Sequence, residues 1–136
     1  MVEYYGWINL SDSTYESDNE EMDIILSKLY SYISNYKLDD TSGFINLHKV
    51  NGSHQLLFAG NANHLSQDVI DIFNLYEYIA EIAIGSYGLL HIRNDESKDA
   101  FNEFEVFVLA RGKIKKEKDP FLSPCIPVIE DDDEWE

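Results

Sequence analysis

The sequence predicts a single α+β domain, spanning residues 1–136, with the element order β-α-β-β-α-β-β. We expect a five-stranded sheet with two helices on one face, a ferredoxin-like variant with an additional edge strand. Two segments carry apolar residues at three- and four-residue spacing, several others alternate with a period of two, and an Asn-Gly pair separates two of the alternating runs. A chain of 136 residues can bury one core without disulfides or metals.

The first strand is predicted over residues 2–10, where apolar and other residues alternate. One face of this strand carries Val2, Tyr4 and Ile8. The other carries Tyr5 and Trp7, and this aromatic face either packs against a second layer or forms an exposed contact surface.

The first helix is predicted to begin at Ser17, because Ser17 and Glu20 have the spacing of a capping box. The acidic residues that follow lie in the first turns, where the helix dipole favours them. The predicted apolar face consists of Met22, Leu26, Leu29, Ile33 and Tyr36.

Asn51-Gly52 predicts a hairpin with a two-residue turn, which fixes the register of its strands. The apolar residues of the pair share one face, which we assign to the core, whereas His48 and His54 lie on opposite faces. The predicted pairs are Val50 with Ser53, Lys49 with His54, Leu47 with Leu56, and Ile45 with Phe58.

The second helix is expected to run from an N-cap at Ser66 to Gly85, where a helix end favours a residue with positive φ. Residues 87–92 then alternate and predict the central strand, and the polar run 94–99 leaves the sheet. The apolar face of this helix consists of Val69, Ile72, Phe73, Tyr76, Ile79, Ala80 and Ala83.

Residues 103–111 predict the last strand, which ends at Gly112, and a lysine-rich stretch follows it. Residues 119–127 contain three prolines, so we expect an ordered extended loop over the sheet. Phe121, Leu122 and Ile126 are its expected apolar anchors, and Cys125 is expected to be a buried structural thiol. Residues 130–136 are expected to form a flexible acidic tail.

Charge is the strongest feature of the composition, since 26 acidic and 10 basic side chains give a net charge of −16. Such a charge disfavours binding to nucleic acid and to anionic membranes, and it speeds encounter with a positively charged partner. It also keeps a small protein soluble. A single cysteine, no apolar run of membrane-spanning length and no recognisable signal peptide predict a cytoplasmic protein.

The residues that usually carry catalysis are not arranged as a site. The four histidines lack the spacing of metal ligands, and the aspartate tract lacks the alternating oxygens of a calcium loop. Gly85 and Gly88 precede a strand, whereas phosphate binding needs a helix at that point. We therefore expect no enzymatic activity, no catalytic residue, no metal and no cofactor.

Four motifs occur in order along the chain: Tyr5-Gly6-Trp7, Asn63-His64, the stretch 84–96, and the segment 119–127. Together they resemble the Imm7 family of immunity proteins from bacterial polymorphic-toxin and contact-dependent inhibition systems. The resemblance covers nearly the whole chain, although Asn94 stands where the family's motif has an aspartate. It implies a small cytoplasmic protein that binds and neutralises a cognate toxin domain.

Charge and resemblance together predict stoichiometric blocking of a basic toxin domain that acts on nucleic acid. We expect the protein to be a monomer when free and to bind its toxin one to one. The candidate contact residues are three aromatic anchors, Tyr5, Trp7 and Tyr87, and a polar and acidic set, Asn94, Asp95, Glu96, Asp99, Asp119, Glu130, Asp131 and Asp132.

Two other functions are compatible with the sequence. One is a small-molecule sensor or enzyme with a pocket between the helices and the Pro-rich segment, which a deep enclosed cavity with convergent His64, His91 or Cys125 would favour. The other is an assembly module that forms a homodimer through an exposed strand edge.

Overall fold

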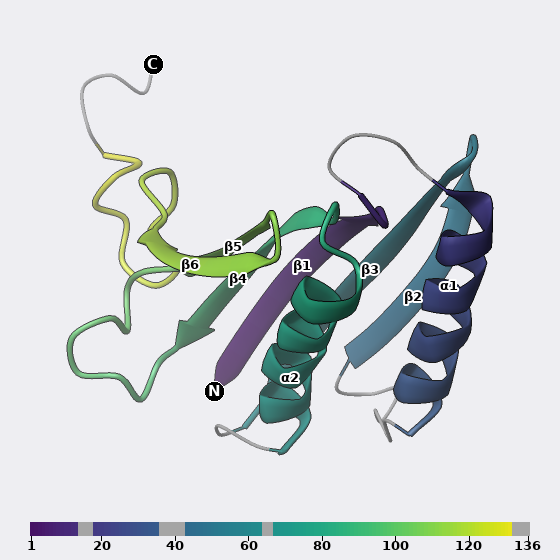
Figure 1. Cartoon of the computed structure of the whole chain (residues 1–136). Coiled ribbons are helices and arrows are strands. Elements are labelled where there is room, and N and C mark those ends of the chain that lie inside the picture. Colours follow the sequence, from purple (N-terminus) through teal and green to yellow (C-terminus); the bar gives the residue numbers. More distant parts are fainter. Residues whose placement is uncertain (14–17, 36–42, 64–66, 132–136) are drawn as a thin grey trace.

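The computed structural model describes residues 1–13, 18–35, 43–63 and 67–131. Its elements follow the order β1 (Val2–Leu10), α1 (Asn19–Ser34), β2 (Gly43–Val50), β3 (Ser53–Ala62), α2 (Gln67–Ile82), β4 (Tyr87–Asn94), β5 (Glu105–Ala110) and β6 (Lys113–Lys118). The strands form one antiparallel sheet in the order β2-β3-β1-β4-β5-β6, with β1 and β4 in the middle (Figure 1). The α+β class is therefore confirmed.

The predicted count of five strands is wrong, because the lysine-rich stretch after Gly112 forms a sixth strand, β6. Arg111 and Gly112, with φ of 52° and 72°, make a two-residue turn that pairs Ala110 with Lys113. The charges of β6 hide its strand character in the sequence. On an edge strand, however, lysines are common because they discourage pairing with another chain.

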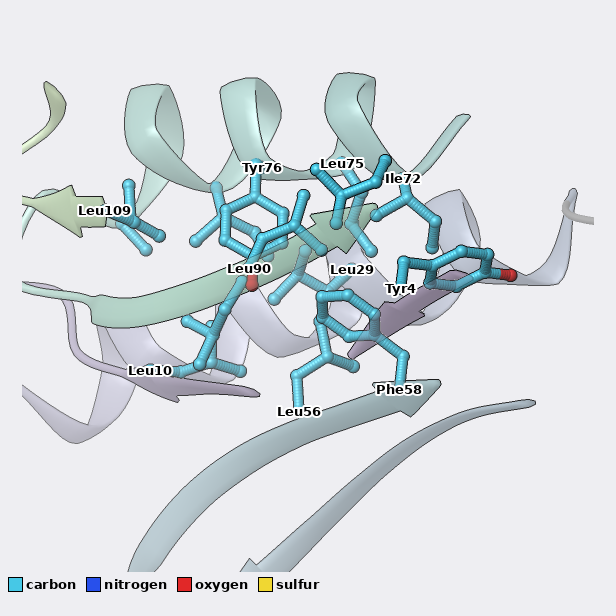
Figure 2. Packing of buried hydrophobic residues seen from close by; sticks show 14 of the residues in the cluster. Tyr4, Leu10, Leu29, Leu56, Phe58, Ile72, Leu75, Tyr76, Leu90 and Leu109 are labelled. Atoms are coloured by element: carbon cyan, nitrogen blue, oxygen red, sulfur yellow. The ribbon is translucent and has the colours of Figure 1, made fainter. Parts of the chain in front are cut away.

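Both helices cover the same face of the sheet, and the core lies between them and the strands (Figure 1). Figure 2 shows Tyr4, Leu56, Phe58 and Leu90 from the sheet meeting side chains of both helices. At the centre, the Tyr76 hydroxyl of α2 donates a hydrogen bond to the Leu89 carbonyl oxygen over 2.7 Å. Burial raises the pKa of Tyr76, so this phenol stays protonated.

The predicted helix faces agree with the structure, with two additions. Of the predicted residues of α1, Met22 and Leu29 are buried, and Leu26 and Ile33 are partly buried against the core. Ile25 and Leu75 are also buried in the core and were not predicted. Tyr36 lies outside the described residues. Neither described helix is long and apolar enough to cross a membrane.

The hairpin register predicted from Asn51-Gly52 is confirmed in full. Val50 pairs with Ser53, and Ile45 with Phe58. Asn51 and Gly52 both have positive φ, at 51° and 84°, as a primed turn requires. A two-residue turn fixes the register of the two strands, and this register places their apolar residues on one face. This pairing can therefore be predicted from the sequence.

Two predicted element ends differ from the structure. The N-cap of α1 is Asp18, whose Oδ1 accepts from the Glu20 amide at 2.9 Å, while Ser17 lies outside the described residues, as does Ser66. Gly85 does not have positive φ. Instead, a Cβ at Gly85 would lie 2.0 Å from the Ser13 carbonyl oxygen, so the position needs glycine because two backbone segments meet there.

Candidate functional site

The sheet face opposite the helices, called the open face below, carries the three predicted aromatic anchors. Trp7 is 40% exposed and Tyr87 51% exposed, and their rings meet edge to face with centroids 6.0 Å apart. Trp7 lies opposite Leu89 in the register, so Trp7 and Tyr87 are diagonal neighbours on adjacent strands. With Asn9, Gln55 and Leu57 they border a shallow depression of about 370 Å³. Of the two interpretations of this aromatic face, the structure favours the exposed surface.

Tyr5 is also on the open face, and both ends of its side chain are held. Its hydroxyl donates to Glu3 Oε2 at 2.6 Å, and this bond to a carboxylate raises the pKa of Tyr5. Its ring meets Phe104 edge to face at 6.2 Å, and His91 packs on Phe104 at 6.1 Å. The exposed ring of Tyr5 is therefore fixed in orientation before any partner arrives.

The polar residues that follow β4 form a compact turn. Asn94 Oδ1 accepts from the Glu96 amide at 3.0 Å, a bond that an aspartate at this position would also make. The Asp95 carboxylate pairs with the Met1 amino group at 2.5 Å, and its amide donates to the Met1 carbonyl oxygen. Glu96 and Asp99 are exposed. The predicted acidic loop thus presents carboxylates to solvent at the β1 and β4 end of the sheet.

The C-terminal loop, residues 119–131, is attached to the β4–β5 connection through the side chain of Asn102. Asn102 Oδ1 accepts from the Cys125 amide at 2.9 Å and from the Ile126 amide at 2.6 Å, and Nδ2 donates to the Ile126 carbonyl oxygen at 2.8 Å. One side-chain amide therefore satisfies three backbone groups of the loop. A lone asparagine in a polar stretch gives no sequence signal for this role.

The expected anchoring of the C-terminal loop by apolar side chains is wrong. Phe121, Leu122 and Ile126 are all exposed, Phe121 to 66%. Cys125 is exposed too, so the expectation of a buried thiol is also wrong. The physical reason is that hydrogen bonds through Asn102, Ser123 and Glu130 order this backbone, which leaves its large side chains free to point outward.

The acidic residues of the C-terminal loop have different environments. Asp119 is buried, with its Oδ2 accepting from the Leu122 amide at 3.2 Å and its amide donating to the Phe104 carbonyl oxygen, so it shapes the loop. Glu130 accepts from the Ser123 amide, and this bond lowers the pKa of Glu130. Asp131 is exposed, and Asp132 lies outside the described residues. Residue 130 therefore belongs to the ordered loop and not to a tail.

The predicted residues fall into three groups, which lie at the two ends of β4 and on the C-terminal loop. Tyr87 and Asn94 are the first and last residues of β4, so the Trp7–Tyr87 pair and the acidic turn lie at opposite ends of one strand. Tyr5 lies between them. Through Phe104, whose carbonyl oxygen accepts from the Asp119 amide, it also borders the C-terminal loop. The open face is therefore joined to the acidic turn through β4 and to the C-terminal loop through Phe104.

The described residues contain no cluster of three or more histidine, cysteine or carboxylate side chains that could hold a metal ion. His64 lies outside them, His91 packs on Phe104, and Cys125 is exposed, so no convergence of these three side chains is seen in the described chain. Two depressions beside α2, of about 190 and 240 Å³, are lined by residues of the helix, the sheet and the β4–β5 connection. No residue of the Pro-rich segment lines either of these two.

Comparisons with known proteins agree with the resemblance found in the sequence. The family model described as Immunity protein 7 matches residues 1–131. Neither the curated proteins nor the solved structures contain a significant match. Because the family model covers nearly the whole chain, from β1 through the C-terminal loop, the protein belongs to the Immunity protein 7 (Imm7) family and is an immunity protein, of the kind that counteracts a toxin.

Proposed function

We propose that this protein neutralises its cognate toxin in the cytoplasm of the cell that makes both, by binding the toxin domain one to one and covering the surface on which the toxin acts. The function is stoichiometric, with no bond made or broken by the immunity protein. We place the protein in a contact-dependent or other polymorphic-toxin system, in keeping with its family.

The observation that carries this proposal is the exposed Trp7–Tyr87 pair on the open face. Large aromatic side chains in water are unfavourable for an isolated protein, but they are the side chains that contribute most to protein interfaces. Trp7 and Tyr87 lie on two central strands and are held by ring contact, so they reach a partner with little loss of conformational freedom. Tyr5 extends this surface towards the acidic loops.

Charge determines the kind of toxin that fits. Asn94, Asp95, Glu96 and Asp99 border one end of the open face, and Glu130 and Asp131 lie on the attached C-terminal loop. A toxin that cuts or modifies nucleic acid needs a basic surface for phosphate groups, and carboxylates can occupy that surface instead. We propose Asp119 as a residue that positions the loop, since its carboxylate is buried.

The test uses the toxin domain encoded immediately upstream. The purified wild-type protein is titrated into this domain while toxin activity and complex formation are followed together, by light scattering and by isothermal calorimetry. We expect inhibition that is complete at one equivalent. No complex, or a complex in which the toxin stays active, would overturn the proposal.

The open face is tested separately with Trp7→Ser and Tyr87→Ser, matched by Tyr30→Ser on the exposed side of α1, where Tyr30 is 57% exposed. The two open-face variants should weaken binding by about tenfold or more, as expected for truncated aromatic hot spots. The Tyr30→Ser variant should bind like the wild type. If all three variants bind like the wild type, the toxin contacts another surface.

A further inference from the structure

We propose that the C-terminal loop is a preformed docking element, and that its outward apolar side chains insert into an apolar hollow on the toxin that is bordered by lysines and arginines. These side chains are Phe121, Leu122, Ile126 and Val128, called the apolar crest below. The inference rests on the proposed function but names a surface that this function does not require.

The first argument is exposure. Phe121 is 66% exposed, Val128 63%, Ile126 54% and Leu122 49%, and all four are carried by one short loop. Single apolar residues on a surface are ordinary, but four large ones within eight residues mark a contact site. In Figure 1 the loop continues from the C-terminal end of β6, at the opposite end of the β5–β6 hairpin from its turn, and lies away from both helices. The crest is therefore accessible to a partner from outside the fold.

The second argument is preorganisation. The crest residues do not hold the loop in place, because Asn102 binds the backbone of residues 125 and 126 through three hydrogen bonds. The loop is closed a second time at Ser123, whose Oγ accepts from the Ile129 amide at 3.1 Å and whose amide donates to Glu130. Its three prolines restrict the backbone further. A loop fixed in this way loses little entropy when its side chains are buried by a partner.

The third argument is charge, and it decides between two occupants. A second copy of this chain would bring the exposed Asp131 carboxylates of both molecules together and join two proteins of net charge −16 each. A toxin surface with cations around an apolar hollow would pair with the same carboxylates. The crest with its acidic border therefore fits a basic partner and disfavours self-association.

Cys125 provides a direct readout, because it is the single cysteine of the chain, is exposed and lies beside crest residue Ile126. The wild-type protein is treated with a small maleimide, alone and saturated with the toxin domain encoded upstream, and the modification of this chain is followed by mass spectrometry. We expect the toxin to slow modification by about tenfold or more. An unchanged rate in a complex that inhibits the toxin would overturn the docking role of the loop.

A second measurement uses Phe121→Ser, Ile126→Ser and Val128→Ser, with Ile24→Ser on α1 as the matched control, since Ile24 is 56% exposed. Thermal unfolding checks that each variant folds. We expect the dissociation constant to rise about tenfold for the crest variants, equivalent to about 1.4 kcal/mol, and to stay within about twofold for Ile24→Ser. Crest variants that bind as tightly as the wild type would contradict the inference, whereas failure of the wild type to bind would contradict the proposed function.

Asn102→Ala tests preorganisation, since Asn102 is a positioning residue that lies behind the loop. We expect this substitution to change the rate at which Cys125 is modified in the free protein. We also expect it to weaken binding to the toxin, mainly by slowing association.

Sedimentation of the free wild-type protein tests whether a second copy of this chain covers the apolar crest. A dimer that Phe121→Ser converts to monomer would assign the crest to a second copy and overturn the inference.

Discussion

Arg93, buried in β4, donates from Nε to the Phe101 carbonyl oxygen over 2.8 Å and so ties the β4–β5 connection to the centre of the sheet. Its Nη1 lies 3.3 Å from Glu3 Oε1, and the other oxygen of Glu3 accepts from the Tyr5 hydroxyl. The residue after Phe101 is Asn102, which holds the C-terminal loop. One guanidinium therefore supports both Tyr5 on the open face and the loop that carries the apolar crest.

Arg93→Met should lower the free energy of unfolding by about 3 kcal/mol, because it leaves Glu3 charged and largely buried without its partner. Urea denaturation measures the change. Lys115→Met is the control, since the Lys115–Glu117 pair is exposed and its loss should cost less than about 1 kcal/mol. Equal effects of the two substitutions would mean that the Arg93 network does not support the fold.

Tyr76→Phe should lower the free energy of unfolding by about 1 to 2 kcal/mol. The substitution keeps the ring in the core but leaves the Leu89 carbonyl oxygen without the hydroxyl that it accepts from. The same denaturation experiment tests it. A variant as stable as the wild type would indicate that this hydrogen bond between α2 and the sheet makes no net contribution to the free energy of unfolding.

Gly85→Ala should lower the free energy of unfolding by about 2 kcal/mol or more, whereas Gly52→Ala should lower it by about 1 kcal/mol. At Gly85 a Cβ would collide with the backbone of Ser13, whereas at Gly52 the space is open and the cost arises from positive φ. Thermal unfolding ranks the two variants. The reverse order would show that the approach between Ser13 and Gly85 can relax.

The bond from the Ser123 amide to Glu130 should break at acidic pH. Hydrogen bonding lowers the pKa of Glu130 below its ordinary 4.5, so the stabilisation of the loop is fully present above that value. It is lost as the pH falls through the lowered, folded-state pKa. The amide resonance of Ser123, followed by NMR, should move with a midpoint below 4.5. Glu130→Gln should abolish this transition, and a midpoint above 4.5 would contradict the assignment.

Association with the toxin domain should slow by about tenfold as the ionic strength rises from low to several times physiological, because salt screens attraction between oppositely charged surfaces. Stopped-flow measurements on the wild type check this. Asp99→Asn together with Asp131→Asn should reduce the salt dependence. An association rate independent of salt would exclude electrostatic steering by this acidic surface.

Much of the fold could be derived from the sequence because its signals are local. The Asn51-Gly52 turn fixed a register that the structure confirms pair by pair, and helical spacing identified the buried faces of α1 and α2. Such patterns depend on the geometry of one turn or one helix. The family was likewise evident from motifs along the chain, and the family model confirms it.

The remaining features depend on contacts between residues far apart in the sequence, which no local pattern encodes. Gly85 is constrained by Ser13 more than 70 positions away, and Asn102 holds residues 125 and 126. The strand β6 was missed for a different reason, since it follows a local Arg-Gly turn but consists largely of charged residues. In the C-terminal loop, polar contacts replace the apolar anchoring expected from composition. They turn Phe121, Ile126 and Cys125 outward, because a loop that is ordered by hydrogen bonds does not need its large side chains for its own stability.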